Sequence, residues 1–404
     1  MKKTPKLRFP EFSGDWKVEK SKNIFDKVKN GVDVKGNEKY RQIGIRSHGK
    51  GLFYKDEVTG KELGNKRVFW IEPNVFIVNI VFAWERAVAR TTENEIGMIA
   101  SHRFPMYKPK EGILDLDYIT YFFKTSKGQS LLELASPGGA GRNKTLGQKE
   151  FDDLNIILPK IDEQKKIAEF LSILDKRIEK QQEKVEALQE YKNGIMSKIF
   201  SQEIRFKDEN GQYYAEWKDK TVDEIVHIFL GLTYTPTYVE EGIPFLSVKD
   251  LKNNKINFAD TKFISKEEFA NATSNAKPKK GDILFGRVGT LGNPIIIDFD
   301  NEFCIFVSLG FLRVKSECVL NSFIVQWMKS SLFAKQVEEK IAGSSQKNLN
   351  TGWLKKFSIN IPSFEEQEKI ASILSKIDSK IEREQEKLKC LNQLKRGLIQ
   401  QMFV

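Results

Sequence analysis

Hydrophobic residues recur at heptad spacing in two long segments, residues 167–199 and 370–402. Within each segment the apolar positions step alternately by four and three residues, and charged residues fill most of the positions between them. This sustained pattern predicts two long α-helices, each with a coiled-coil seam. The apolar seam positions are Ile167, Leu171, Leu174, Ile178, Val185, Leu188 and Ile195 in the first segment and Ile370, Leu374, Ile377, Ile381, Leu388, Leu391 and Leu398 in the second.

The two segments are copies of each other. Residues 158–200 align with residues 361–403 without a gap, and 18 of the 43 aligned positions are identical. A proline precedes each segment and acidic residues follow it, which favours a helix start. The pattern therefore predicts the same long helix twice in one chain.

Both seams are interrupted by polar residues at the same two places. Gln181 corresponds to Glu384, and Lys192 corresponds to Lys395. Polar groups in a seam lower stability but fix register and partner. We therefore expect the two helices to pair antiparallel with each other, about a pseudo-twofold axis. The alternative is that each helix lies on its own domain.

The duplication reaches beyond the helices. A short apolar stretch that stops at a proline precedes each helix, LNIILP at residues 154–159 and FSINIP at residues 357–362. A polar loop lies upstream of each stretch, GRNKTL at residues 141–146 and SSQKNL at residues 344–349. The chain is therefore one unit written twice.

The middles of the two copies have diverged. Residues 30–134 and 231–341 cannot be aligned, and runs such as VFIVNIVFAW at residues 75–84, rich in β-branched and aromatic residues, predict buried strands. The expected fold class is α+β, with two globular mixed α/β domains separated by two long antiparallel helices. The expected limits are 1–160 and 204–362 for the domains and 161–203 and 363–404 for the helices.

Charge and composition narrow the classes of partner. The 404-residue chain is 40% hydrophobic, which suits folded domains, and 66 Lys and Arg against 55 Asp and Glu give a net charge of +11. A basic balance favours nucleic acid before an anionic membrane surface, and a solvated lysine-rich surface is an equal alternative. No apolar run is long enough to cross a bilayer, and the three cysteines lack zinc-site or disulfide spacing. These features predict a protein of the reducing cytoplasm with no membrane partner.

Two diverged basic domains held apart by paired helices would act as a ruler. A helix of this length spans ~55 Å, and sites one turn apart on double-stranded DNA lie ~34 Å apart along one face. Because the middles differ, each domain would read its own bases. The sequence thus predicts an asymmetric bipartite DNA target, with two half-sites and a fixed non-specific spacer.

Three motifs resemble those of a known family. Both helices open with P-x-x-x-E-Q-x-K-I-A, at residues 159–168 and 362–371. FAWERA at residues 82–87 is similar to an aromatic–acidic motif of some target-recognition domains, and KKGDILFGRVGTLG at residues 279–292 is similar to a strand and loop of others. Together with the duplication, they resemble the specificity (S) subunit of Type I restriction–modification systems over essentially the whole chain.

This resemblance implies a subunit without catalytic activity of its own. It implies that the helices dock two methyltransferase (M) subunits and that two restriction (R) subunits join them. S-adenosylmethionine, ATP and Mg²⁺ would serve those partners in N6-adenine methylation or ATP-dependent cleavage, with no cofactor in this chain. The sequence agrees, since it has no G-x-x-x-x-G-K-[ST] phosphate loop and no metal-ligand spacing around His48, His102 or His227.

Candidate DNA-contacting residues are polar or basic and lie in the diverged middles or the duplicated loops. Such side chains read base edges, while Lys and Arg on phosphates supply affinity. For each residue alone, a surface or folding role is equally open. The candidates are Arg41, Arg46, Ser47, His48, Lys50, Arg86, Arg90, Arg142, Asn143 and Lys144 in the first domain and Thr233, Tyr234, Thr235, Arg287, Thr290, Ser344, Ser345, Gln346, Lys347 and Asn348 in the second.

Two other functions stay open on the sequence alone. A coiled-coil scaffold protein without DNA sequence readout would need the same helices, but neither the net charge of +11 nor the diverged middles. A self-contained nuclease would need acidic residues and lysine arranged for catalysis, and no such arrangement stands out. DNA recognition without catalysis is the leading hypothesis.

Overall fold

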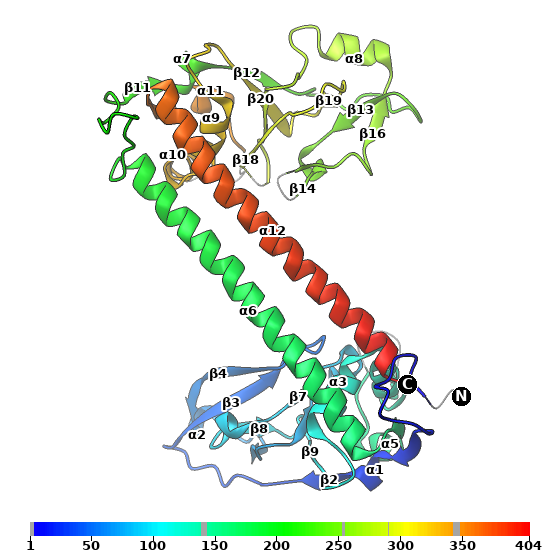
Figure 1. The fold of residues 1–404 in the computed structure, drawn as a ribbon. Helices are drawn as coiled ribbons and strands as arrows, with labels where there is room; N and C mark the ends of the chain where they lie inside the picture. The colour runs from blue at the N-terminus through cyan, green and yellow to red at the C-terminus, as the bar shows by residue number, and fades with distance from the viewer. Residues whose placement is uncertain (1–3, 139–143, 253–254, 290, 342–347) are drawn as a thin grey trace. The chain divides into compact units, whose positions relative to one another are not determined.

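The chain folds into two mixed α/β units. The computed structural model describes residues 4–138, 144–252, 255–289, 291–341 and 348–404. Unit 1 comprises Met1–Gln182 and Glu386–Val404, and unit 2 comprises Glu183–Gln385. The expected fold class, α and β elements in two domains with two long helices, is confirmed (Figure 1).

Two long helices, α6 (Ile161–Phe200) and α12 (Phe364–Met402), carry the predicted seams. Every seam position is buried or half-buried, whereas most positions between them are exposed. The limits of the units fall inside both helices, so each unit contains the first half of one helix and the second half of the other.

The C-terminal end of each helix completes the core of a unit. Phe200, at the end of α6, lies 5.7 Å from Phe323 between ring centroids, in the main core of unit 2. Phe403, just after α12, lies 5.2 Å from Tyr118 in the main core of unit 1. Each core is therefore closed by a helix end that is distant in sequence.

The main sheet of unit 1 has the strand order β2-β9-β6-β7, with antiparallel neighbours. Alternate residues of the middle strand enter two cores, because side chains along a strand point to opposite faces. Phe76 and Val78 join the core beneath the helices, and Ile77 joins the core shared with the second sheet. The strands are β2 (Phe25–Val28), β6 (Phe76–Val78), β7 (Val88–Arg90) and β9 (Met106–Pro109).

A second sheet of unit 1 has the order β4-β3-β8-β5, in which β3 and β8 are parallel. The β3–β4 pairing shifts register between Arg41 and Ile43, which leaves Gln42 at a bulge. Ile43 packs in the same core as Ile77 of the main sheet. The strands are β3 (Lys39–Ile45), β4 (Leu52–Thr59), β5 (Val68–Trp70) and β8 (Ile99–Ser101).

Capped helices accompany these sheets. Asp115 caps α3 by accepting from Tyr118 N at 2.8 Å, and Thr125 caps α4 by accepting from Gly128 N at 3.0 Å. Strand β1 pairs antiparallel with β10, directly before α6. The remaining elements of unit 1 are β1 (Lys17–Lys20), α1 (Ser21–Ile24), α2 (Gly60–Leu63), η1 (Ala83–Glu85), η2 (Glu93–Glu95), α3 (Leu116–Lys124), α4 (Ser126–Leu134), α5 (Gln148–Asp152) and β10 (Asn155–Leu158).

Unit 2 repeats the strand order of the main sheet, and in its described residues the second sheet has three strands where that of unit 1 has four. Its main sheet has the order β12-β20-β17-β18, its second sheet has the order β16-β13-β19 with β13 parallel to β19, and β11 pairs with β21 before α12. The elements are β11 (Lys218–Thr221), α7 (Val222–Ile225), β12 (Val226–Leu230), β13 (Ile243–Leu246), η3 (Val248–Asp250), β14 (Leu251–Lys252), β15 (Lys255–Ile256), β16 (Lys262–Ile264), α8 (Lys266–Ala272), β17 (Ile283–Gly286), β18 (Gly292–Ile296), β19 (Cys304–Ile305), β20 (Leu309–Val314), α9 (Asn321–Met328), α10 (Ser331–Ile341), α11 (Thr351–Lys355) and β21 (Ser358–Ile361).

The middles that cannot be aligned thus share the strand order of their main sheets. In unit 1 the central strand β6 pairs antiparallel with β7 and β9. In unit 2 the central strand β17 pairs in the same way with β18 and β20. Leu146 N donates to Ile80 O in unit 1 and Leu349 N donates to Arg287 O in unit 2, each at 2.8 Å. The ends of the duplicated loops are therefore hydrogen-bonded to the segments that follow equivalent strands, β6 and β17. The backbone contact is the same in both units although the side chains differ.

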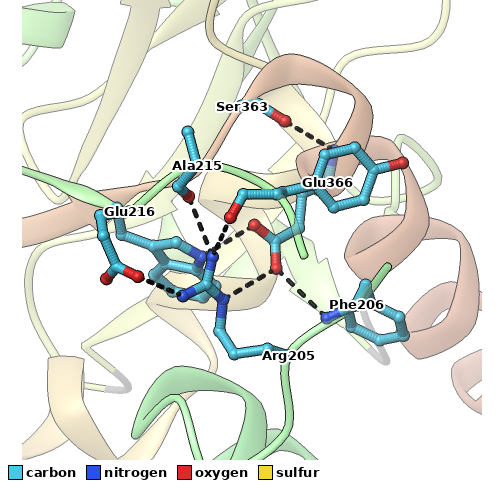
Figure 2. Close-up of polar contacts among 8 residues, drawn as sticks. Arg205, Phe206, Ala215, Glu216, Ser363 and Glu366 are labelled. Atoms are coloured by element: carbon cyan, nitrogen blue, oxygen red, sulfur yellow. Dashed lines mark hydrogen bonds and ion pairs between the residues drawn. The ribbon is translucent and has the colours of Figure 1, made fainter. Parts of the chain in front are cut away.

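A buried glutamate fixes the start of each long helix. In unit 2, Glu366 accepts from Arg205 Nε at 3.3 Å, from Phe206 N at 3.4 Å and from Trp217 Nε1 at 3.0 Å (Figure 2). The Glu366 side chain is 0% exposed. Arg205 also donates to the backbone oxygens of Tyr214 and Ala215. One carboxylate therefore ties the segment before β11 to α12.

Unit 1 has the same clamp. Glu163 accepts from Arg8 Nε at 2.8 Å, from Arg8 Nη2 at 2.7 Å and from Trp16 Nε1 at 3.3 Å. The next residue, Gln164, accepts from Asp115 N and donates to Ile113 O. This is the physical role of the Glu-Gln pair in the repeated helix-opening motif.

Candidate nucleic-acid interface

The turn after β6 brings several candidates of unit 1 together. Arg86 follows η1 with a left-handed backbone, φ 61°. His48 N donates to Glu85 O at 2.7 Å, and Gly49 N donates to Arg86 O at 2.9 Å. Ser47 Oγ donates to the Glu85 carboxylate at 2.8 Å. The FAWERA motif therefore fastens the loop after β3 to the end of the central strand.

The arginines of this motif region are held by the protein itself. Arg86 Nη1 donates to Lys124 O at 3.2 Å, and Arg90 forms an ion pair with Asp117 at the start of α3. Both side chains are half-buried, and Nε of each is buried without a hydrogen-bond partner among the described residues. These contacts hold the turn against α3.

The basic candidates in β3 and in the loop after it face outward. Arg41, Arg46, His48 and Lys50 are exposed. Arg46 is steered by its neighbours, since its Nη1 donates to Leu52 O at 3.1 Å and its guanidinium carbon lies 5.3 Å from the centroid of the Phe53 ring. Exposed, oriented cations of this kind can reach a ligand without first breaking a buried contact.

Lys144, in the duplicated loop of unit 1, lies beside the same turn. Lys144 Nζ lies 5.8 Å from the centroid of the Trp84 ring, which is a cation–π contact. Trp84 O in turn accepts from Gln129 Nε2 of α4 at 3.1 Å. Two candidates of this loop, Arg142 and Asn143, lie outside the described residues.

In unit 2, Arg287 is buried rather than exposed. Arg287 is 7% exposed, and burial lowers the pKa of its guanidinium. Nε donates to Leu349 O at 3.2 Å and Nη1 donates to Val307 O at 3.0 Å. Arg287 therefore ties the duplicated loop to the turn after β19, a role that the sequence did not reveal.

The other candidates of unit 2 divide in two groups. Thr233, Tyr234 and Thr235 are exposed, and Tyr234 Oη donates to Glu268 at 2.6 Å, which raises the pKa of the phenol. Asn348 forms an isolated antiparallel β-bridge with Val288. The Oδ1 atom of Asn348 is buried and has no hydrogen-bond partner in the described part of the chain. The remaining candidates lie outside the described residues: Thr290, Ser344, Ser345, Gln346 and Lys347.

A set of cations that was not among the candidates lies around a hollow in unit 1. Lys55, Lys66, Arg67 and Arg103 line a cavity of about 640 Å³. The signal was present in the sequence as two short polar and basic runs, NKR at residues 65–67 and SHR at residues 101–103. Their neighbourhood could not be predicted, because it depends on the antiparallel pairing of β5 with β8.

The polar residues of the seams form ion pairs inside each unit. In unit 2, Lys192 Nζ lies 2.6 Å from Asp378, and Lys184 Nζ lies 3.2 Å from Glu384. The later residue of α6 pairs with the earlier residue of α12, so these helix segments are antiparallel. They pack side by side, as Figure 1 shows for unit 2.

The pair Lys192–Asp378 has an equivalent in unit 1, where Lys395 pairs with Asp175. Each aspartate has a further neutral partner, because Asp175 accepts from Tyr121 Oη at 2.7 Å and Asp378 accepts from Gln326 Nε2 at 3.1 Å. Both units therefore contain the same polar interruption of an apolar seam.

Burial alone would raise the pKa of Asp378, but hydrogen bonds from Lys192 and Gln326 outweigh it and hold the pKa below its ordinary value. The charge of Lys329, 3.6 Å away, acts in the same direction. Burial lowers the pKa of Lys329, and it lowers the pKa of Lys124 in unit 1 as well. The aspartate therefore stays ionised and fixes the register of the helices in its unit.

Within the described residues, no group of three or more His, Cys, Asp and Glu side chains is arranged to hold a metal ion. No described helix is long and apolar enough to span a bilayer. The arrangement of the described candidates is one of basic and polar surface loops on buried supports.

Comparisons with known proteins identify the family. A family model described as the Type I restriction modification DNA specificity domain matches residues 13–189 and again residues 214–393. The Type I restriction enzyme MjaVIII specificity subunit of Methanocaldococcus jannaschii is 27% identical over 295 residues, which are 70% of this chain and 68% of that protein. The Type I restriction enzyme EcoBI specificity subunit of Escherichia coli is 22% identical over 247 residues, 56% of this chain and 52% of that protein.

Solved structures show the same fold. The S subunit of the Type I restriction–modification system from M. genitalium matches with a TM-score of 0.59 at 19% identity, covering 99% of both chains. A chain from a structure of complex assembly in the Type I system matches with a TM-score of 0.59 at 16% identity, covering 95% of this chain and 96% of that one. Because the family model covers most of the sequence in two copies, the chain belongs to the family of Type I restriction–modification DNA specificity subunits, which are non-catalytic.

Proposed function

We propose that this specificity subunit binds an asymmetric bipartite DNA sequence. Unit 1 reads one half-site, unit 2 reads the other, and the bases between them are a spacer of fixed length that neither unit reads. The exposed loops after β3 in unit 1 and after β12 in unit 2 carry the side chains that meet the DNA.

One observation supports this proposal above the others. The two units share the strand order of the main sheet, the buried clamps and the helix contacts, yet the residues between the duplicated ends cannot be aligned. A duplicated fold with different outward-facing side chains is what two readers of different sequences require. A scaffold protein would have no such reason for divergence confined to the globular part of each unit.

We also propose that each unit docks one methyltransferase subunit, giving two M subunits, and that two R subunits join them. Exposed apolar residues occur at equivalent positions of the helices, away from the seams. Phe170 and Leu394 in unit 1 are 37% and 52% exposed, and Ile373 and Tyr191 in unit 2 are 37% and 58% exposed. Apolar side chains in this position are typical of a protein interface. S-adenosylmethionine, ATP and Mg²⁺ would then be used by the partners, in the cytoplasm.

The test is co-expression with a methyltransferase subunit of the same restriction–modification system, followed by genome-wide mapping of N6-methyladenine. The expected result is one asymmetric motif with a constant gap. A single contiguous palindrome would contradict the proposal, and complete absence of methylation and DNA binding would favour the scaffold function. Exchange of residues 30–134 for those of a relative should change one half-site only, whereas a change in both would exclude modular reading.

A further inference from the structure

The hollow of unit 1 is surrounded by cations with no opposing charge. Lys55 comes from β4, Lys66 and Arg67 from the segment before β5, and Arg103 from the turn after β8. No carboxylate lines the cavity, and no ion pair to any of these four side chains occurs among the described residues. Side chains of like charge gathered around one space repel each other, and an anion in that space would remove the repulsion.

The backbone beneath these cations is fixed. Val68 pairs with Ser101 in the β5–β8 ladder, and His102 N donates to Arg67 O at 3.1 Å. The two basic runs therefore meet at one edge of the sheet. Four cations presented from paired strands and their turns form a built surface rather than a scatter of surface lysines.

Neutral donors accompany the cations. The lining also includes the amides of Gln42 and Asn65 and the hydroxyl of Ser101. Gln42 lies at the bulge between β3 and β4, and bulges redirect side chains. Cations with amide and hydroxyl donors, and without carboxylates, match the oxygens of phosphate groups.

We propose that this hollow binds backbone phosphates of double-stranded DNA, next to the half-site that unit 1 reads. The inference rests on the proposed function and adds a site to it. Contacts to phosphates position a protein on the duplex without reading bases. The hollow therefore sets affinity and register, while the exposed loop after β3 is left to discriminate between bases.

Among its described residues, unit 2 has no equivalent set of cations at the corresponding turn. The turn after β19, which corresponds to the turn after β8, is Phe306, Val307 and Ser308. Val307 O there accepts from Arg287, so the space is used for an internal contact. Unit 1 is therefore expected to supply more of the salt-dependent binding energy than unit 2.

The experiment uses the full chain with its methyltransferase partner and measures binding to the mapped target duplex over a range of salt concentrations. The variant Lys66→Glu with Arg103→Glu is compared with Lys17→Glu with Lys29→Glu, which makes the same charge change at exposed residues of unit 1 outside the hollow. Each phosphate contact contributes a slope of about 0.9 to the plot of log affinity against log salt. The hollow variant is expected to lose about two such contacts and at least ten-fold in affinity at physiological salt, equally for target and random duplexes.

Three results would overturn the inference. They are equal losses in the hollow and control variants, a loss restricted to particular bases of the half-site, and saturable binding of inorganic phosphate that the hollow variant abolishes while DNA binding stays intact. Lys66→Gln with Arg103→Gln, checked for native circular dichroism, replaces the glutamate variant if that variant does not fold. If the wild-type protein binds no DNA, the proposed function fails. If the wild-type protein binds DNA and the hollow variant binds it with the same affinity and salt dependence, this inference alone fails.

Discussion

Unit 1 and unit 2 have the same buried polar contacts at their long helices but expose different charged groups. Both contain a fully buried glutamate at the start of a long helix, held by an arginine and a tryptophan. Both contain an aspartate–lysine pair between helix segments. By contrast, unit 1 exposes cations around a hollow, whereas the corresponding turn of unit 2 has Phe306 and Val307, and the backbone oxygen of Val307 accepts from the buried Arg287.

This difference shows which residues a duplicated fold can change. A buried carboxylate without its partner is costly, so both members of a clamp must be kept together. An exposed side chain away from such contacts has little effect on stability. The surface of each copy could therefore diverge toward its own ligand while the supports stayed the same.

The largest expected effect comes from the glutamate clamps, and it tests whether the units are equivalent. Glu366→Ala leaves Arg205 and Trp217 without their shared acceptor, and Glu163→Ala does the same to Arg8 and Trp16. Each change should lower the free energy of unfolding of its own unit by about 3–5 kcal/mol. Hydrogen exchange, followed separately for the two units, measures it.

The two clamp variants are controls for each other, and Glu368→Ala, at an exposed neighbour in α12, should leave exchange unchanged. Loss of protection spread equally over both units in either clamp variant would show that the clamps do not act locally. The comparison between units would then have to be abandoned.

The aspartate–lysine pairs sharpen the comparison, because their burial differs. The Lys192 side chain is 5% exposed, whereas that of Lys395 is 25% exposed. Asp378→Ala should therefore cost about 3 kcal/mol and Asp175→Ala about 1–2 kcal/mol, since the more buried lysine loses more when it is left unpaired. Urea unfolding of both variants and of the matching double mutants measures the coupling; equal costs would contradict the argument from burial.

The same pair predicts a pH dependence. Because the pKa of Asp378 is held below its ordinary value in the folded protein, its stabilisation is complete above the ordinary range of an aspartate, about pH 4. It is lost as the pH falls through the lower folded pKa. Unfolding of unit 2 between about pH 5 and pH 2 should therefore depend less steeply on pH in Asp378→Asn than in the wild type. An unchanged slope would remove Asp378 from the account.

Arginines that support the loops should show a smaller contrast. Arg287→Ala leaves the carbonyls of Leu349 and Val307 without their donor, whereas Arg86→Ala leaves only Lys124 O. The expected losses are about 2 kcal/mol and about 1 kcal/mol, by the usual cost of an unsatisfied buried group. Thermal unfolding of both variants gives the comparison, and a stable Arg287→Ala with altered base preference would instead make Arg287 a reader of DNA.

The smallest expected effect on stability is that of Tyr234→Phe. The residue is 52% exposed, and the change removes only its hydrogen bond to Glu268. The unfolding midpoint should not move measurably, while methylation of the half-site read by unit 2 should fall if the loop after β12 meets DNA. Unchanged methylation would exclude this hydroxyl from recognition, and Ser47→Ala offers the matching test in unit 1.

The two long helices and their seams could be predicted from the sequence, because the spacing of apolar residues along a helix indicates which positions are buried. The seam from Ile167 onward, its interruptions at Lys192 and Lys395, and the repeated Glu-Gln opening all describe positions whose environment repeats along a helix. The surface candidates were harder to judge. Arg287 and Lys50 are both basic residues near glycines, yet one is buried against backbone oxygens and the other is exposed.

The sequence by itself determined the duplication, the two long helices and the charged interruptions of their seams, since these depend on local spacing. Only the tertiary structure decided that the main sheets of the two divergent middles share a strand order. It also decided that Lys66 and Arg103 face one hollow and that Glu163 and Glu366 each close a clamp. Such neighbours come from strand pairing and helix packing between residues far apart in the chain, and no local pattern records which distant residues will meet.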